Sequence, residues 1–372
     1  MITRTFLAIL LLLASVVLPA AESLPKRSAG KYLVSLRIAP EGLFAQEESQ
    51  IEFHVEDSSQ QDPLSGAAPV IRAEIEVSID MPSMAGMPPF HEVAHPESVP
   101  GDYGVHPTFS HGGDYVMRID INPPQDGAFH VEFPLGVHDA TAGHNRKPQP
   151  PRYQLQFLAS PKNPKAGEPT DLQLTVRERD NPKTPLTAFD RTHEELLHLI
   201  IVRADLAYFA HVHPTLGDDG VFRIRHEFAA GGEYHLFADV APKGAGSQVL
   251  MAKLKVSGSP GAPSSADTAA GPSVQLSKAN LQFPAGKTTR VIFSVQPSEG
   301  VEPYLGARAH LIAIYQDAVT FVHAHADESK PFDGTFAFLG RFPQPGSYRA
   351  WVQFKFHGQV ITREFTLEAK DR

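Results

Sequence analysis

The stretch YFAHVHPTLGDDGVFRIRHEFAAGGEYHLFADV, from Tyr208 to Val240, carries the pattern on which the whole chain is built. It begins with an H-x-H-P motif and continues with two runs of alternating apolar and polar residues, which are typical of half-buried β-strands. The same spacing of glycine, two aromatic residues, glycine and tyrosine occurs three times: Gly101, Tyr103, Phe109, Gly113, Tyr115; Gly220, Phe222, Phe228, Gly232, Tyr234; and Gly334, Phe336, Phe342, Gly346, Tyr348. A repeat of roughly 110 residues predicts tandem domains rather than a solenoid.

The composition indicates an all-β protein. The 372 residues include 33 prolines and 28 glycines, and few segments have a helical period. About seven short strands per repeat predict three tandem immunoglobulin-like β-sandwiches, in which the Gly-x-Tyr step would form a tyrosine corner. The chain has no cysteine, so packing alone must join the sheets, and a metal site must use His, Met, Asp or Glu. A net charge of −9 argues against a nucleic-acid partner.

Residues 1–21 predict a secretory signal peptide. Arg4 precedes an apolar run, and Ala20 and Ala21 offer small residues for cleavage. We therefore expect an exported protein, periplasmic or secreted, without a transmembrane segment in the mature chain. An uncleaved N-terminal anchor is the alternative.

The repeats and the composition divide the rest of the chain. We expect β-sandwich domains over residues 31–137, 152–257 and 273–370. Residues 258–272 are rich in Gly, Pro, Ser and Ala, which predicts a flexible linker.

A histidine triplet with one spacing is present in both the second and the third domain: His198, His211 and His213, and His310, His323 and His325. Residues i and i+2 of a strand share a face about 6.6 Å apart, and a hairpin around Asp205 would bring His198 back beside the H-x-H pair. A two-residue turn would place His198 opposite His211, whereas a turn one residue longer would place it on the other face. Neutral imidazole suits copper, zinc and nickel. Alternatively, these are interior histidines with local hydrogen bonds, which a duplication copies equally well.

The first domain lacks the triplet but contains MPSMAGMPPFHEVAH, a loop with five candidate ligands: Met81, Met84, Met87, His91 and His95. Thioethers are soft ligands that select Cu(I). A Pro- and Gly-rich loop runs over the surface and is poorly suited to core packing. The alternative is that the methionines pack against a sheet end or a partner.

The span 72–121 resembles the YtkA-like and FixH-like β-sandwich domains of exported bacterial proteins. The resemblance rests on M-P-x-M in this loop, P-G-x-Y at Pro100 and G-x-Y at Gly113. It implies copper handling or cytochrome oxidase assembly, with the loop methionines and histidines as candidate ligands. The second domain is similar to secreted bacterial proteins with an F-x-H-x-H-P…G-x-Y-x-L-F-A-D pattern and a copper association. Neither resemblance supplies catalytic residues.

Together these patterns predict a periplasmic metal-binding protein that acts in copper buffering, delivery or tolerance. The loop would hold Cu(I), the triplets would hold Cu(II) or zinc, and a periplasmic copper-transfer partner would exchange the metal. A structural or adhesion-type array of immunoglobulin-like domains without metal is the alternative. A metal-dependent hydrolase is a third reading, because three histidines with an open position can activate water, but no general base accompanies the triplets.

Overall fold

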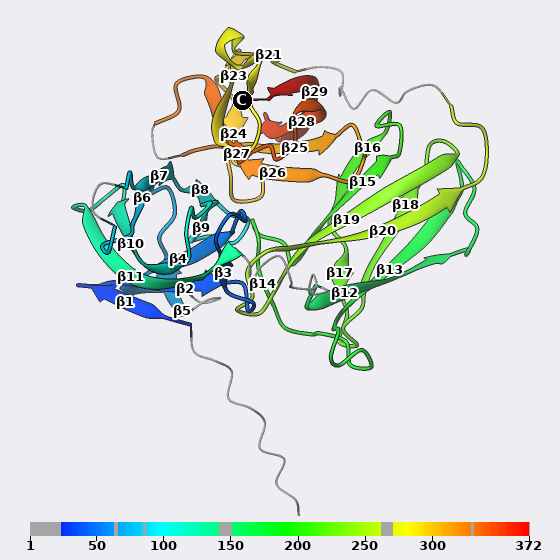
Figure 1. The fold of residues 1–372 in the computed structure, drawn as a ribbon. Coiled ribbons are helices and arrows are strands. Elements are labelled where there is room, and N and C mark those ends of the chain that lie inside the picture. The colour runs from blue at the N-terminus through cyan, green and yellow to red at the C-terminus, as the bar shows by residue number, and fades with distance from the viewer. Residues whose placement is uncertain are drawn as a thin grey trace, which may run out of the picture.

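The computed structural model describes residues 24–62, 66–84, 87–140, 151–261, 271–328 and 331–371. The predicted signal peptide lies outside the described residues, and so does most of the predicted linker. The regular elements of the described residues are strands, apart from one 3-10 turn at Lys278–Asn280, so the all-β prediction is confirmed. Figure 1 shows three groups of strands, blue to cyan, green, and yellow to red. Within the described ranges, no helix has the length and apolarity needed to span a bilayer.

The first domain is a sandwich of two sheets. Its strands are β1 (Lys26–Ala29), β2 (Tyr32–Ile38), β3 (Leu43–Phe44), β4 (Ile51–Asp62), β5 (Gly66–Pro69), β6 (Glu74–Asp80), β7 (Phe90–Val93), β8 (His95–Pro96), β9 (Asp102–Val105), β10 (Gly113–Asn122) and β11 (Phe129–His138). One sheet has the order β1-β2-β4-β9-β8, with β5 on β4, and the other has the order β3-β11-β10-β6-β7. Every second residue of β10 and β11 is buried between the sheets, as alternation predicts.

The second domain is also a two-sheet sandwich. Its strands are β12 (Tyr153–Ser160), β13 (Pro169–Glu178), β14 (Phe189–Asp190), β15 (Leu197–Arg203), β16 (Phe209–Val212), β17 (Thr215–Leu216), β18 (Phe222–Glu227), β19 (Gly232–Pro242) and β20 (Gln248–Val256). The sheets have the orders β12-β13-β18-β17 and β14-β19-β15-β16, with β20 on β19.

The third domain repeats this plan. Its strands are β21 (Ser273–Leu276), β22 (Phe283–Pro284), β23 (Thr288–Gln296), β24 (Val301–Glu302), β25 (His310–Tyr315), β26 (Phe321–His325), β27 (Thr335–Arg341), β28 (Gly346–Phe356) and β29 (Gln359–Lys370). The sheets have the orders β21-β23-β27 and β22-β29-β28-β25-β26, with β24 on β28. The prediction of tandem immunoglobulin-like sandwiches is thus confirmed.

A tyrosine corner is present in all three domains. Each repeat tyrosine donates its hydroxyl proton to the carbonyl oxygen four residues earlier: Tyr115 to His111 at 2.9 Å, Tyr234 to Ala230 at 2.8 Å and Tyr348 to Gln344 at 2.9 Å. The glycine two residues before each tyrosine has a φ that side chains rarely adopt: Gly113 at +135°, Gly232 at +147° and Gly346 at +133°. The repeat spacing is therefore explained by backbone geometry.

Replacing Tyr234 with phenylalanine should lower the stability of the second domain by about 1–2 kcal/mol, because the buried Ala230 carbonyl loses its donor. Urea denaturation followed by tyrosine and tryptophan fluorescence would measure this change. An unchanged unfolding curve would contradict a structural role for the corner.

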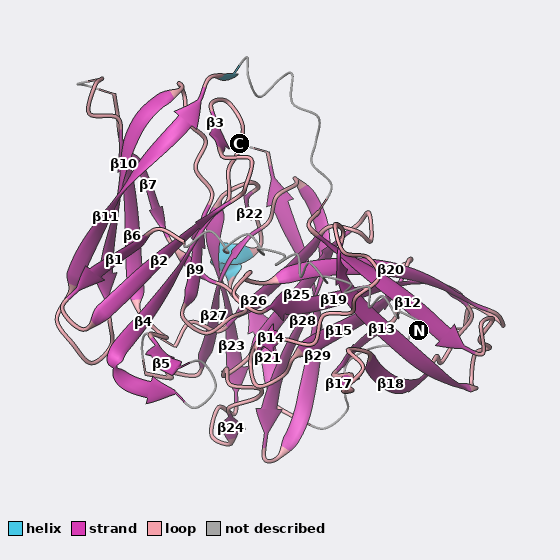
Figure 2. Ribbon diagram, turned by 90° about the horizontal axis from the view of Figure 1, so that it is seen from below, coloured by secondary structure: helices cyan, strands magenta, loops and turns pink. Residues whose placement is uncertain are grey.

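The second and third domains bury the outer faces of two sheets against each other. All seven residues of β15 are buried, although a sandwich strand needs to bury only one face. An apolar cluster fills the space between the domains: Ile200, Val202 and Phe237 from the second, and Ile312, Ile314 and Trp351 from the third. Figures 1 and 2 show β15 and β19 beside β25 and β28.

Two aromatic stacks cross this interface in a reciprocal way. Phe209 of β16 stacks on Trp351 of β28 with ring centroids 4.5 Å apart, and Phe321 of β26 stacks on Phe237 of β19 at 5.2 Å. The interface therefore has approximate two-fold symmetry, in which each H-x-H strand contacts the long central strand of the other domain.

The first domain contacts both of the others through polar side chains. Ser98 donates to Asp239 of the second domain at 3.2 Å, Arg72 pairs with Glu328 of the third domain at 2.7 Å, and Thr288 of the third domain donates to Glu92. All three domains thus meet near the end of the β15–β25 interface.

Candidate metal centre

The second-domain hairpin has a longer turn than the two-residue turn considered above. Arg203 and Tyr208 close the turn, and His211 lies opposite Ile200 rather than opposite His198. Because the shift is two residues, the side-chain parity is kept, and His198, Ile200 and His211 share the outer face of the sheet. The histidines therefore lie at the interface with the third domain and not at the rim of one sandwich.

The structure brings the second-domain triplet together. Nδ1 of His198 lies 2.9 Å from Nε2 of His211, and Nε2 of His213 lies 3.3 Å from the same atom. Ligand atoms of the three residues all lie within 4.8 Å of one another. A tetrahedral ion with metal–nitrogen bonds of about 2.0–2.1 Å holds its ligand nitrogens about 3.3–3.4 Å apart. Two of the spacings in the triplet, 2.9 and 3.3 Å, are close to this value.

The third-domain triplet has the same arrangement. His310 lies opposite His325 and Ile312 lies opposite His323 in the β25–β26 pair. Nδ1 of His310 is 3.4 Å from Nε2 of His323, and the three histidines again lie within 4.8 Å in their ligand atoms. The duplicated sequence spacing thus produces a cluster of three histidines in each of the two domains.

Backbone carbonyls fix the tautomer of the first histidine in each triplet. Nε2 of His198 donates to the Thr192 carbonyl at 2.8 Å, and Nε2 of His310 donates to the Tyr304 carbonyl at 2.9 Å. In a neutral ring the proton is then on Nε2, so Nδ1 presents a lone pair to its triplet.

The central histidine of each triplet is oriented by the other domain. Nδ1 of His211 donates to Oε1 of Gln353 at 2.7 Å, and Nδ1 of His323 donates to Oδ2 of Asp239 at 2.9 Å. Gln353 and Asp239 occupy equivalent positions, five residues after the corner tyrosine of each domain. This is the usual arrangement behind a metal-binding histidine, whose second nitrogen donates to a carboxylate or carbonyl oxygen.

The Asp239 carboxylate is fully buried but has several donors. Burial opposes its ionisation, yet the hydrogen bonds from His323 and Ser247 lower its pKa below the usual value. Ser98 of the first domain adds a third hydrogen bond. The third-domain triplet therefore has an anionic group behind it where the second-domain triplet has a neutral amide.

Burial favours the neutral form of five triplet histidines: His198, His211, His213, His310 and His325. Burial, with a smaller contribution from neighbouring imidazoles, lowers the pKa of His198 and of His213 to about 4. The pKa values of His211, His310 and His325 are also lowered well below the usual value, mainly by burial. Neutral imidazole is the form that binds a metal ion, so little proton release would accompany binding at neutral pH.

His193 lies beside the third-domain triplet, although no motif in the sequence indicates this. Its loop in the second domain reaches the third-domain triplet, where its ring stacks on His325 with centroids 3.5 Å apart. Its backbone has a left-handed φ of +46°, and Leu305 holds the equivalent turn in the third domain with a φ of +50°. The equivalent residue of the third domain is this leucine, so its loop brings no fourth histidine to the second-domain triplet. The two triplets are therefore not identical.

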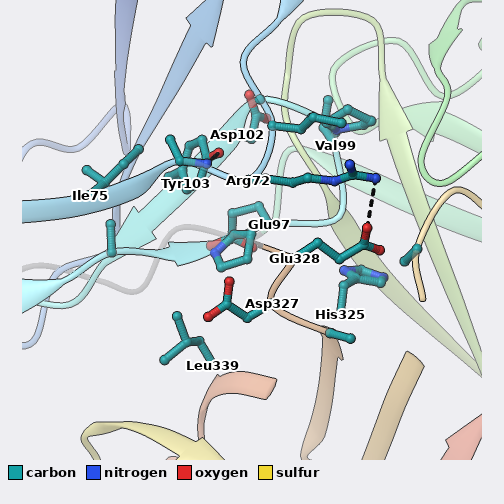
Figure 3. Close-up of a pocket in the computed structure, with 18 of the residues that line it drawn as sticks. Arg72, Ile75, Glu97, Val99, Asp102, Tyr103, His325, Asp327, Glu328 and Leu339 are labelled. Atoms are coloured by element: carbon teal, nitrogen blue, oxygen red, sulfur yellow. Dashed lines mark hydrogen bonds and ion pairs between the residues drawn. The ribbon is translucent and has the colours of Figure 1, made fainter. Parts of the chain in front are cut away.

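A cavity of about 420 Å³ adjoins the third-domain triplet. Residues of all three domains line it, including His193 and His325, and the Arg72–Glu328 ion pair crosses its edge, as Figure 3 shows. Ile75, Val99 and Leu339 give it apolar walls. The third-domain triplet thus has space beside it for a further ligand.

The methionine loop has a different environment from the one expected. Met81 and Met87 are partly buried and pack against the first-domain core, whereas Met84 is 41% exposed. His91 is exposed on β7, whereas His95 is buried on β8 of the other sheet. The potential ligand atoms within 4.8 Å of His95 belong to Glu92 and His106. The structure does not bring His91 and His95 together. Binding of Cu(I) by the methionines stays a prediction.

The comparisons with solved structures show only remote likeness. The FdeC adhesin of Escherichia coli is 12% identical over 93% of this chain and 98% of that chain, with a TM-score of 0.22. A putative membrane anchored protein from Corynebacterium diphtheriae is 11% identical over 91% and 90% of the two chains, with a TM-score of 0.20. Scores this low say nothing about function. No curated protein matches the chain in sequence.

The family models match most of the chain. Residues 29–120 match the YtkA-like family, which confirms that part of the predicted resemblance. Residues 152–257 and 267–371 match the model described as Domain of unknown function (DUF8832), which covers more than half of the chain. The chain therefore belongs to the DUF8832 domain family, with two copies of that domain behind a YtkA-like domain.

Proposed function

We propose that this is an extracytoplasmic metal-binding protein whose second and third domains hold two transition-metal ions at their shared interface. Its role would be copper buffering, delivery or tolerance, by ligand exchange with a partner protein. Copper comes first because, for a given set of nitrogen ligands, the affinity for divalent ions peaks at Cu(II). Zinc, which also binds imidazole, is the alternative ion.

One observation carries the proposal: two ring nitrogens face each other inside each triplet, at 2.9 Å in the second domain and 3.4 Å in the third. Thr192 accepts the proton of His198 Nε2 and Gln353 accepts that of His211 Nδ1, so the remaining nitrogens have no proton when both rings are neutral. These two acceptors lie only 2.9 Å apart. The third domain repeats the arrangement through Tyr304 and Asp239. A bound cation converts the repulsion into two coordination bonds.

Local hydrogen bonding does not account for the third histidine of the third-domain triplet. His325 is 4% exposed, and neither of its ring nitrogens has a hydrogen-bond partner among the described residues. Buried polar groups without partners are uncommon and costly, at about 1–3 kcal/mol each. A metal ion at the triplet would satisfy one of these nitrogens.

The test is metal analysis of the full chain purified without an affinity tag. We expect at least two tightly bound equivalents of Cu(II) or Zn(II), measured by elemental analysis and by titration against a competing chelator. A metal-free protein that also fails to bind either ion would support a structural or adhesion-type array instead.

The residues behind the ligands should set the relative affinity of the two sites. Replacing Asp239 with asparagine should weaken metal binding at the third-domain triplet by about 10- to 100-fold, because the buried carboxylate no longer raises the basicity of His323. The matched change Gln353→Glu should have the opposite effect on the second-domain triplet. Chelator competition would measure both, and equal affinities in all three proteins would contradict the assignment.

A further inference from the structure

A third cluster of potential ligands lies in the first domain and shares no residue with the triplets. Ligand atoms of Glu92, His95 and His106 lie within 4.8 Å of one another. Glu92 is on β7, the edge strand of one sheet, and His95 is on β8, the edge strand of the other. His106 directly follows β9, the neighbour of β8. The cluster therefore spans the gap between the two sheets of the first sandwich.

Two nitrogens of this cluster are buried without hydrogen-bond partners in the described part of the chain. They are Nδ1 of His95, a residue that is 8% exposed, and Nδ1 of His106. The two rings are stacked, with centroids 5.0 Å apart and an interplanar angle of 11°. Such atoms require an explanation, because native proteins seldom bury polar groups unpaired.

The carboxylate of the cluster is held in place from two directions. Oε2 of Glu92 accepts the backbone N–H of His106 at 2.9 Å, and Oε1 accepts the hydroxyl proton of Thr288 from the third domain. Each carboxylate oxygen keeps a further lone pair for another partner. Arg341 lies near His106 and helps to lower its pKa, and Arg341 forms an ion pair with Glu48.

The other ring nitrogen of His95 lies beside a carboxylate. Nε2 of His95 lies 3.1 Å from Oε1 of Glu97, which leaves Nδ1 to point elsewhere. Gly104 lies opposite His95 in the β8–β9 pair, and a Cβ there would collide with Glu97 and crowd His95. A glycine at this position therefore makes the room that the His95–Glu97 pair occupies.

We propose that Glu92, His95 and His106 form a third metal site, which takes Zn(II) and joins the two sheets of the first domain. Two imidazoles and one carboxylate suit zinc, and they are poor ligands for Cu(I), which prefers sulfur. In a chain without cysteine, this ion would connect the two sheets at their edge strands, a role that a disulfide has in other sandwiches. The site is separate from the proposed interface centres and has a structural role.

The test uses the full chain with both interface triplets disabled by His211→Ala and His323→Ala. In this background we expect one remaining equivalent of Zn(II), which raises the thermal midpoint of the protein by mass action. Adding His106→Ala, or the isosteric Glu92→Gln, should weaken that binding by at least about 100-fold and abolish the thermal shift. His130→Ala is the matched control, because His130 is an exposed histidine on β11 of the same domain.

The outcomes separate this site from the interface centres. A background protein that binds no Zn(II), or one whose remaining Zn(II) is unaffected by both His106→Ala and Glu92→Gln, would overturn the third site. Failure of the proposed function would look different: the wild type and the disabled background would then bind the same amount of metal.

Discussion

Replacing His211 with alanine should remove one equivalent of tightly bound Cu(II) or Zn(II) and leave the third-domain triplet loaded. His211 Nε2 lies at the centre of its triplet, close to both His198 and His213, so its loss leaves two nitrogens that no longer share a common neighbour. A four-ligand zinc site binds with about 10–16 kcal/mol, so one ligand is worth roughly 3 kcal/mol, or more than 100-fold in affinity. His323→Ala should have the same effect on the third domain.

The measurement is titration of each variant and of the double variant against a chelator of matched affinity. His226→Ala is a suitable control, because its ring belongs to neither triplet and instead contacts the Tyr208 hydroxyl at 3.0 Å. If both single variants retain the stoichiometry and affinity of the wild type, the triplets do not bind the metal. If either single variant loses both equivalents, the two sites depend on each other more strongly than separate ligand sets would require.

The two triplets could be predicted from the sequence because their geometry is local. An H-x-H pair on a strand shares a face whatever the rest of the fold does, and a hairpin returns the third histidine to its neighbours if the turn keeps the parity. The tyrosine corners could be predicted for the same reason, since the donor and acceptor are four residues apart. The exact register of the hairpin could not be predicted. The observed four-residue turn at 204–207 and a two-residue turn place the same side chains on the same face.

The side chains that orient the central histidines could not be predicted, because they come from other domains. Asp239 and Gln353 each orient a histidine more than 80 positions away in sequence, and His193 reaches a triplet in the next domain. One sequence signal did indicate a second buried face: LHLIIVR at 197–203 has apolar residues at consecutive positions, which is typical of a strand covered on both sides. The outer face of β15 is covered by the third domain, and the pattern of apolar residues in one strand does not predict which other domain packs against it.

Replacing Trp351 with alanine should weaken both interface metal sites at once and destabilise the protein by about 3–5 kcal/mol. Trp351 is fully buried between the second and third domains and stacks on Phe209, two residues before His211. Two residues after Trp351, Gln353 holds the His211 ring, so a shift of β28 displaces the group that orients the ligand. Because the reciprocal contact from Asp239 to His323 crosses the same interface, loosened docking disturbs both triplets.

A matched control distinguishes this effect from general destabilisation. Phe293 is equally buried but lies between the two sheets of the third domain, outside the interface cluster. Phe293→Ala should lower the stability by a similar amount while the second-domain triplet keeps its affinity, as measured by chelator competition below the unfolding temperature. If Trp351→Ala lowers only the stability and both metal affinities persist, each triplet is preorganised within its own domain, and the cross-domain hydrogen bonds do not tune the sites.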